Sequence, residues 1–430
     1  MRIIKYPPKE QWDEIISRSE LNTEHLFERV EQILKEVRER GDEAVTKYGE
    51  LFDGVKLNEP EVSIAERAEA FHLVPEKLRN AISVAKINIE KFHSAQIHNP
   101  TKIETSLGVL CWQKATPIEK VGLYIPGGTA PLFSTVLMLA VPAKIAGCKE
   151  IILCTPPNKE GKVHPAIIYA AQIAGVDRIF KIGGVQAIAS MSYGTESVPK
   201  VYKIFGPGNQ YVTAAKQLVS LKDVAIDMPA GPSEVEVIAD ASANPAFVAV
   251  DMLSQAEHGT DSQSLLVTNS EKLAMEVQEE IYRQLGTLPR KEFIEKSLQN
   301  SRIILLEDKE KIIELTNRYA PEHLIIQTTD YMELAEQIKN AGSVFLGHYT
   351  PESAGDYASG TNHTLPTNGY AKAYSGVNLD SFIKKITFQE ISKEGLYHLG
   401  PTIEKMAVGE GLDAHKNAVN IRINCNKTTN

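Results

Sequence analysis

The chain has 430 residues, of which 43% are hydrophobic, 23% charged and 7% aromatic. This composition is typical of a globular protein of about two to four domains, and it excludes collagen-like, disordered and disulfide-scaffold proteins. The 46 basic and 55 acidic residues give a formal net charge of −9, which argues against nucleic acid or an anionic membrane as the main partner.

The sequence also lacks the patterns of a membrane or secreted protein. Its apolar run at 136–141 meets Pro142 and Lys144, far short of the roughly 18 residues that a spanning helix needs. The first ten residues contain prolines and charges in place of the apolar core of a secretion signal. The cysteines form no CxxC pair: Cys111, Cys148, Cys154 and Cys425. We therefore expect a cytoplasmic protein in a reducing compartment.

The first half of the chain is predicted to pass from helices to a parallel sheet. Residues 10–90 are expected to be largely helical, because their apolar residues recur at three- and four-residue spacing. Short apolar strands, each followed by a helix, are then predicted at 121–125, 150–154, 178–182 and 201–205. Repeated strand-turn-helix units of this length indicate a doubly wound α/β domain.

Glycine turns follow three of these strands, at Gly127-Gly128, Gly183-Gly184 and Gly206-Pro-Gly208. Parallel sheets bind ligands beyond the carboxyl ends of their strands, and glycines allow backbone amides to approach a phosphate. Any turn from strand to helix favours glycine, however, and no GxGxxG is present. Spacing alone therefore leaves both a nucleotide site and a purely structural role open.

A second α/β set follows, with strands predicted at 235–239, 265–267, 303–306, 324–326 and 344–346. The sequence thus predicts two tandem Rossmann-like, doubly wound globules with helical N-terminal and C-terminal extensions. Residues 348–376 are rich in Gly, Ser, Thr, Pro and Asn, and a connection this long is usually functional when ordered. After Ile386 the tail is expected to be helical.

Candidate metal ligands lie in the second half of the chain. A helix predicted over 245–258 places Asp251, Gln255 and His258 on one face, although such a polar stripe is usually solvated. Asp356, His363 and His415 stand in segments rich in helix breakers. Imidazole, carboxylate and amide-oxygen donors suit zinc, manganese or cobalt. Because the residues have no linear signature, a metal site and a solvated surface both remain possible.

Glu322 and His323 lie between a predicted helix and the strand at 324–326. Adjacent Glu and His can supply two proton acceptors for a reaction that needs two deprotonations. In the alternative interpretation, His323 simply begins the strand and Glu322 faces water.

Seven motifs together resemble the histidinol dehydrogenase family over nearly the whole chain. They are GLYIPGGTAPL at 122–132, FGPGNQYV at 205–212, DMPAGPSEV at 227–235, LSQAEHG at 253–259, APEHL at 320–324, SAGDYASGTNHTLPT at 353–367 and EGLDAH at 410–415.

The resemblance implies oxidation of L-histidinol to L-histidine through bound L-histidinal, by two hydride transfers to two NAD molecules at the end of histidine biosynthesis. By position, Gln255, His258, Asp356 and His415 match zinc ligands that also contact substrate, with one zinc ion per subunit. Glu322 and His323 match the acid-base pair, and His323 also contacts substrate. Further matches are Ser233, His363 and Glu410 for substrate and Tyr124, Gln186 and Asn209 for NAD.

The resemblance also implies a homodimer with shared active sites. We expect residues 1–24 to be a helical extension, 25–126 with 235–377 to form the domain of the metal and acid-base residues, and 127–234 to form the NAD domain. Residues 378–430 are expected to reach the partner subunit. Three alternatives remain: a thiol adduct at Cys154, a zinc hydrolase, and a two-domain binding protein without catalysis.

Overall fold

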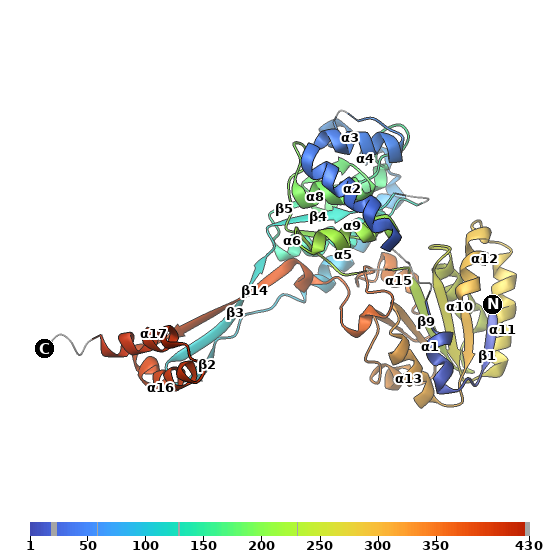
Figure 1. The fold of residues 1–430 in the computed structure, drawn as a ribbon. Coiled ribbons are helices and arrows are strands. Elements are labelled where there is room, and N and C mark those ends of the chain that lie inside the picture. The colour runs from blue at the N-terminus through green and yellow to red at the C-terminus, as the bar shows by residue number, and fades with distance from the viewer. Residues whose placement is uncertain (19–23, 58, 128–129, 230, 426–430) are drawn as a thin grey trace. The chain divides into compact units, whose positions relative to one another are not determined.

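The computed structural model describes residues 1–18, 24–57, 59–127, 130–229 and 231–425. The chain divides into two compact units (Figure 1). The first unit contains residues 1–95 and 118–382, and the second contains residues 96–117 and 383–430. Within the described ranges, no helix combines the length and the apolar character that crossing a bilayer requires.

One half of the first unit is built on a parallel five-stranded sheet with the order β6-β5-β4-β7-β8. Its strands are β4 (Lys120–Tyr124), β5 (Glu150–Thr155), β6 (Arg178–Lys181), β7 (Lys203–Phe205) and β8 (Ala225–Ile226). The crossover helices are α6 (Phe133–Ala146), α7 (Pro165–Ala174), α8 (Gly184–Tyr193) and α9 (Gln210–Ser220). Because the strand order reverses at β4, the carboxyl ends of β4 and β7 form a switch point where such sheets bind ligands.

The N-terminal helices cover this same sheet. They are α2 (Glu24–Arg40), α3 (Asp42–Tyr48), α4 (Ile64–Leu73) and α5 (Glu76–Ser94). Helices α2 and α3 pack with α8 and α9 on one face, while α4 and α5 pack with α6 and α7 on the other. In α5 the buried residues Ile82, Ala85 and Ile89 recur at the spacing of one helix face. This apolar stripe packs α5 into the core beside α6.

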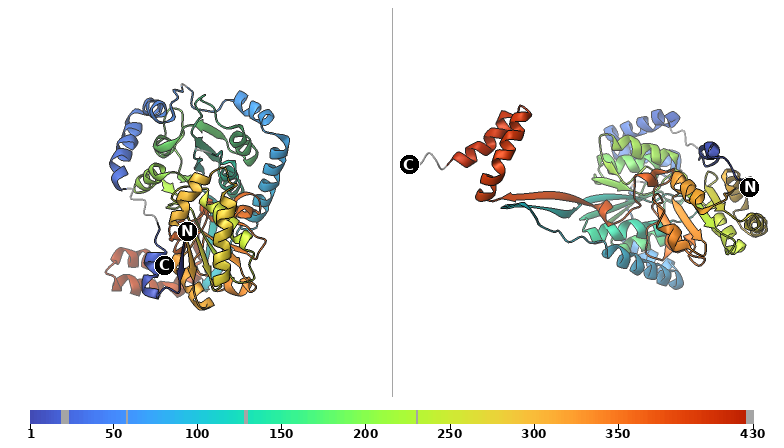
Figure 2. Two further views of the ribbon diagram at one scale, coloured as in Figure 1. Left: turned by 90° about the vertical axis from the view of Figure 1, so that its right-hand side faces the viewer. Right: turned by 90° about the horizontal axis from the view of Figure 1, so that it is seen from below.

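The other half of the first unit is a parallel six-stranded sheet with the order β1-β11-β10-β9-β12-β13. Its strands are β1 (Arg2–Lys5), β9 (Glu234–Ala239), β10 (Gln263–Thr268), β11 (Arg302–Leu305), β12 (His323–Gln327) and β13 (Ser343–Leu346). Helices α10 (Pro245–Ala256), α11 (Glu271–Leu285) and α12 (Lys291–Asn300) pack on one face, and α1 (Trp12–Ile15), α13 (Lys309–Tyr319) and α14 (Tyr331–Ala335) on the other (Figures 1 and 2).

The two tandem doubly wound globules confirm the predicted fold class, but three predictions about its parts are wrong. Residues 24–95 and 118–126 do not join 235–377, because β4 is the middle strand of the other sheet and the helices bury their apolar faces there. Residues 1–24 are not only helical, since β1 extends the six-stranded sheet at its edge. The helix predicted over 245–258 ends at Ala256.

The second unit contains an antiparallel sheet and a helical hairpin. The sheet has the order β14-β3-β2, with β2 (Ile103–Ser106), β3 (Val109–Pro117) and β14 (Ile383–Ile391). Residues 387–391, expected to be helical, instead continue β14, because the strand pairs with β3 along its full length and Phe388 stacks on Trp112. Helices α16 (Lys393–Gly409) and α17 (Asp413–Asn424) pack side by side at Gly400 (Figure 2).

Candidate active site

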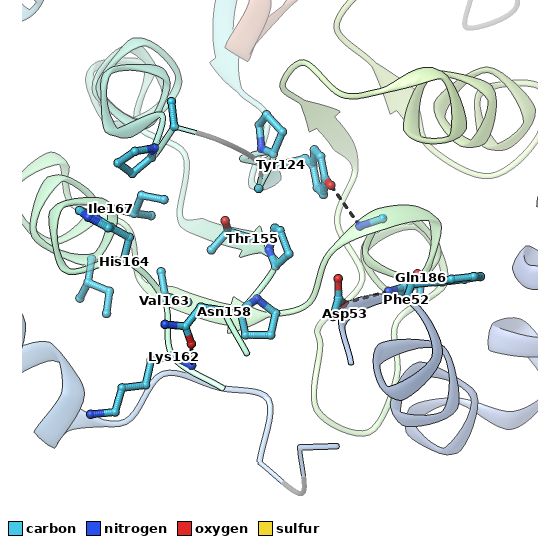
Figure 3. A pocket seen from close by; sticks show the side chains of 18 of the residues that line it. Phe52, Asp53, Tyr124, Thr155, Asn158, Lys162, Val163, His164, Ile167 and Gln186 are labelled. Carbon is cyan, nitrogen blue, oxygen red and sulfur yellow. Dashed lines mark hydrogen bonds between the residues drawn. The ribbon is translucent and has the colours of Figure 1, made fainter. Parts of the chain in front are cut away.

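A cavity of about 990 Å³ lies in the first unit beyond the carboxyl ends of the five-stranded sheet. Its walls include Tyr124 at the end of β4, Thr155 at the end of β5 and Gln186 in α8 (Figure 3). Asn209, before α9, also lines the cavity. The cavity therefore occupies the edge that the strand order marks as a ligand site. All three residues that the resemblance matched to NAD line it.

Hydrogen bonds fix the polar groups on the wall of this cavity. The Gly184 amide donates to Tyr124 Oη at 3.0 Å, and burial raises the pKa of Tyr124, so its hydroxyl stays protonated. Gln186 Nε2 donates to Asp53 Oδ2 at 3.4 Å, as Figure 3 shows. Gln186 Oε1 is buried without a hydrogen-bond partner among the described residues and remains available as an acceptor. Asn209 Oδ1 caps α9.

Asp53 is a cavity residue that sequence reasoning missed. Burial raises its pKa to about 6, against the hydrogen bonds from Gln186 and the Gly183 amide. Asp53 ends a short helical segment at 49–53, far from any strand-to-helix turn, so no motif pointed to it. Only the packing of the N-terminal helices on this sheet brings it to the cavity.

The glycine turns have a packing reason of their own. Gly206 has φ +121°, and a Cβ added there would lie 2.0 Å from the Tyr124 carbonyl oxygen. The close approach of β4 and β7 thus requires glycine whether or not a phosphate binds. Gly128, in the first of the three predicted turns, lies outside the described residues.

A second group of the predicted site residues lies where β9 and β12 begin. Glu322 is 5% exposed, and its Oε2 accepts hydrogen bonds from Ser233 Oγ at 2.5 Å and the Glu234 amide at 2.9 Å. Burial raises the pKa of Glu322 to about 8, although both hydrogen bonds oppose the rise. Glu322 does not face water, so that part of the alternative interpretation is wrong, although His323 does begin the strand. A buried carboxylate with this pKa is suited to general-base work near neutral pH.

His323 begins β12 and is also buried. Its Nδ1 lies 3.3 Å from the Glu234 carbonyl oxygen, so this nitrogen carries the proton and Nε2 is a free acceptor. Nε2 has no hydrogen-bond partner among the described residues and lies 3.7 Å from Asp356 Oδ1. Burial, and then the charge of His258, lower the pKa of His323 to about 3. The ring is therefore neutral at physiological pH.

His258, Glu352 and Asp356 bring one potential ligand atom each within 4.8 Å of one another. Glu352 and Asp356 are four residues apart in α15 (Glu352–Tyr357), which places them on one helix face. Burial raises the pKa of Asp356 to about 7 and raises that of Glu352 well above its usual range. A bound cation would instead favour the ionised form of both carboxyl groups, so this buried and half-buried pair is a candidate for metal ligation.

The donor set fits a metal ion of the zinc type. Both amide atoms of Gln255 and both carboxylate oxygens of Glu352 are buried without hydrogen-bond partners in the described parts of the chain. Gln255 lies in the last turn of α10, and His258 follows the helix in an exposed turn. Amide, imidazole and carboxylate donors are the ligands that zinc and related ions bind.

The polar stripe on α10 is not solvated as a whole. Asp251 is buried and accepts a hydrogen bond from Gln327 Nε2 at 2.7 Å, so it does not join the ligand cluster. Glu352, by contrast, belongs to the cluster and was missed from the sequence. Its spacing of four residues before Asp356 is the signal that sequence reasoning overlooked.

His363 connects this cluster with the five-stranded half of the unit. Its Nδ1 lies 2.8 Å from the Asp356 carbonyl oxygen, and its Nε2 lies 3.0 Å from Thr135 Oγ1 in the first turn of α6. The neighbouring Asn362 Nδ2 donates to the Met138 carbonyl oxygen at 2.6 Å. The long loop after α15 is therefore ordered by contacts to both halves.

The structure brings Ser233, Gln255, His258, Glu322, His323, Asp356 and His363 together in the first unit. Glu410 and His415 belong to the second unit, where both are exposed: Glu410 follows α16, and His415 lies in the first turn of α17. Cys154 is fully buried in the core, and burial raises its pKa. A thiol in that position lacks the exposed thiolate that a covalent adduct needs.

Comparisons with a family model, with curated proteins and with solved structures all point to the same family. The family model described as histidinol dehydrogenase matches residues 16–423. The chain is 68% identical to the histidinol dehydrogenase of Bacteroides thetaiotaomicron over 99% of both chains, and 52% identical to that of Escherichia coli over 97% of this chain and 96% of the relative. The crystal structure of histidinol dehydrogenase from Elizabethkingia anophelis matches with a TM-score of 0.98 and 52% identity, covering 100% of this chain and 99% of the other. The chain therefore belongs to the histidinol dehydrogenase family and is an oxidoreductase.

Proposed function

We propose that the chain oxidises L-histidinol to L-histidine through bound L-histidinal, in two successive hydride transfers to two NAD molecules, as the last steps of histidine biosynthesis. The observation that carries this proposal is the buried Glu322-His323 pair beside the ligand cluster. One member has a pKa raised to about 8 and the other a pKa lowered to about 3. Family membership adds the substrate and excludes the hydrolase and the non-catalytic binding protein.

Gln255, His258 and Asp356 are the residues of the first unit that would hold zinc, and His415 would complete the set. When bound, the ion would orient the imidazole and amino groups of histidinol and polarise the reacting oxygen. The unpartnered amide of Gln255 supports this assignment. We propose that His415 and Glu410 come from the partner subunit, so that a homodimer has two shared sites.

The cavity beside Tyr124, Gln186 and Asn209 is the proposed NAD site. When bound, NAD would supply the hydride acceptor for both oxidations. Gln186 Oε1 offers an unsatisfied acceptor, and the protonated Tyr124 hydroxyl offers a donor. The ordered loop from Asp356 to His363 contacts α6, which begins beside the cavity, and so keeps the two groups of residues in one fixed unit.

His323 would remove the proton from the alcohol oxygen in the first oxidation. Its Nε2 is unprotonated, accepts no hydrogen bond from the described part of the chain and lies 3.7 Å from Asp356 Oδ1 in the ligand cluster. The Glu234 carbonyl holds the ring in this tautomer by accepting the Nδ1 proton. When the alcohol carbon loses its hydride, the oxygen has already given its proton to His323, so a neutral aldehyde results.

Glu322 would act between the two oxidations. As a carboxylate it removes one proton from the water that attacks the aldehyde carbon, while His323 returns the proton of the first oxidation to the carbonyl oxygen, so that a hydrated aldehyde and a neutral imidazole result. His323 then removes a hydroxyl proton from the hydrate as its carbon loses the second hydride, and the carboxylic acid that forms ionises to the carboxylate of histidine. The buried setting keeps bulk water away and retains the aldehyde until it is oxidised.

The test is to follow NADH absorbance after adding histidinol and NAD to the purified chain. We expect two NADH per histidine formed, with no histidinal released. Glu322→Gln should slow oxidation of supplied histidinal far more than that of histidinol to the aldehyde, whereas His323→Asn should slow both. Equal defects of Glu322→Gln on the two substrates would refute the division of labour, and absence of NADH with the wild-type chain would refute the function.

A further inference from the structure

Arg18 makes a set of buried contacts that the proposed reaction does not use. Its Nη2 donates to Glu234 Oε1 at 2.7 Å and to the Tyr319 carbonyl oxygen at 2.7 Å, and its Nε contacts Glu234 Oε2. The guanidinium also lies 3.9 Å from the centre of the Tyr319 ring. The exposed fractions of the Arg18 and Glu234 side chains are 16% and 2%. Arg18 and Glu234 thus form a bidentate ion pair, a geometry that requires a planar guanidinium group.

The peptide groups of Glu234 hold both proposed proton acceptors. The Glu234 amide donates to Glu322 Oε2, and its carbonyl accepts from His323 Nδ1. A rotation of this one residue would release the Glu322 carboxylate and the His323 ring together. The Glu234 side chain is clamped by Arg18, so the guanidinium governs that rotation.

The second contact of Arg18 holds the other side of the pair. Tyr319 ends α13, and Ala320 then adopts the left-handed conformation with φ 55° before the chain reaches Glu322. By binding the Tyr319 carbonyl, Arg18 fixes the turn that delivers Glu322 and His323 to β12. Arg18 therefore connects Glu234 at the start of β9, which orients Glu322 and His323, to the 319–322 turn, which precedes them in the chain.

Arg18 is not needed to attach the N-terminal segment. Strand β1 pairs with β11, Trp12 is buried, and Ser17 is bound through its carbonyl by Gln263 Nε2 at 3.1 Å. A buried ion pair gives little net stability compared with well-packed apolar residues. Stability alone therefore does not explain why the Arg18–Glu234 ion pair lies beside Glu322 and His323.

We propose that Arg18 is a positioning residue for the reaction, which fixes Glu234 and the 319–322 turn so that Glu322 and His323 keep their working orientation. The proposal rests on the proposed function, because it assumes that these two residues transfer the protons. It assigns a role in the active site to the N-terminal segment, which the sequence presents only as an extension.

The test compares Arg18→Met, Arg18→Lys and Glu234→Gln with a matched control. Arg318→Met is that control, because Arg318 binds Asp13 on the same N-terminal segment but is exposed and has no contact with Glu234. Arg18→Met should lower kcat by about 10- to 100-fold, the effect of a misplacement of about 1 Å, with KM for histidinol and zinc content unchanged. Arg18→Lys should have a kcat between those of Arg18→Met and the wild type, because an ammonium group keeps the positive charge but cannot form the bidentate pair with Glu234. Arg318→Met should match the wild type.

Activity is expressed per folded, zinc-loaded site, so that partial unfolding does not count as slow chemistry. A normal kcat for folded Arg18→Met would overturn the proposal, as would an equal loss in Arg318→Met. If Arg18→Met does not fold, Arg18→Lys and Glu234→Gln decide, and wild-type kcat in both would overturn it. Glu322→Gln is assayed in parallel to distinguish the two failures. A normal kcat for Arg18→Met beside a slow Glu322→Gln overturns only the role of Arg18, whereas a fully active Glu322→Gln overturns the proposed role of Glu322 and the role of Arg18 with it.

Discussion

The pKa of Glu322, raised to about 8 by burial, makes a specific prediction for the pH dependence of the second oxidation. Only the ionised carboxylate can accept the proton of water. With this pKa, about one Glu322 in eleven is ionised at pH 7 and about one in a hundred at pH 6. The rate of histidinal oxidation should therefore rise nearly tenfold per pH unit up to pH 7 and level off above pH 8. His323, with a pKa lowered to about 3, stays neutral throughout and adds no second limb in this range.

The assay is kcat/KM for supplied histidinal, measured at constant ionic strength between about pH 6 and pH 9.5, since this parameter reports the free enzyme. Glu322→Gln should lose the limb and be slower by about 10²- to 10⁴-fold where the wild type is fastest. His323→Asn should be slower at every pH and keep the limb. A limb that persists in Glu322→Gln, or one centred near 6.5 that disappears in His323→Asn, would show that the histidine titrates and that our assignment is wrong.

Four other outcomes follow from the structure. His258→Asn should lose zinc to a chelator more readily than the wild type and should regain activity only at higher zinc concentration; stoichiometric zinc with normal turnover would contradict the ligand assignment. Cys154→Ser should leave both oxidations nearly unchanged, as steady-state assays with histidinol and histidinal would show. Refolded mixtures of inactive His258→Ala and His415→Ala should regain up to about one quarter of wild-type activity if sites are shared between subunits, whereas inactive hybrids would place His415 in its own subunit's site. Burial raises the pKa of Glu236 to about 8, so its ionisation opposes folding and the wild type loses stability as pH rises from about 4.5 to 8. Glu236→Gln should therefore gain stability relative to the wild type over this range, by at most about 5 kcal/mol in urea unfolding. A stability difference that does not depend on pH would refute this.

The fold class was predictable because both sheets are parallel and buried, so that their strands appear as short apolar runs between helices. The assignment of segments to domains was not. Nothing local distinguishes a helix that covers one sheet from a helix that covers the other, and residues 24–94 precede every strand of both sheets except β1. The strand at 383–391 was missed for a related reason. Its Lys, Gln and Glu residues favour a helix, and its partner β3 lies more than 260 residues earlier in sequence.

The candidate site was predictable where residues stand in distinctive motifs, as Glu322 and His323 do. Asp53 and Arg18 escaped because their importance comes from tertiary contacts, and Glu352 escaped although its spacing from Asp356 was visible in the sequence. Glu352 offers one ligand atom to the cluster with His258 and Asp356, and Arg18 reaches Glu234 across 216 positions of sequence. Single-sequence patterns report residue type and local spacing, whereas these roles depend on which buried charge meets which neighbour.

Gly206 bears on how the proposed NAD site could be engineered to take a different dinucleotide. The Tyr124 carbonyl leaves no room for any side chain at position 206. In a library that varies this turn to accept a different dinucleotide, variants substituted at 206 would therefore misfold before their binding could be tested. Asn209, three residues later, has an ordinary φ of −68°, and its cap on α9 can be supplied by Ser, Thr or Asp. Substitutions at Asn209 and Asp53, which line the cavity, would therefore change ligand contacts. Substitutions at Gly206 would only prevent β4 and β7 from approaching each other.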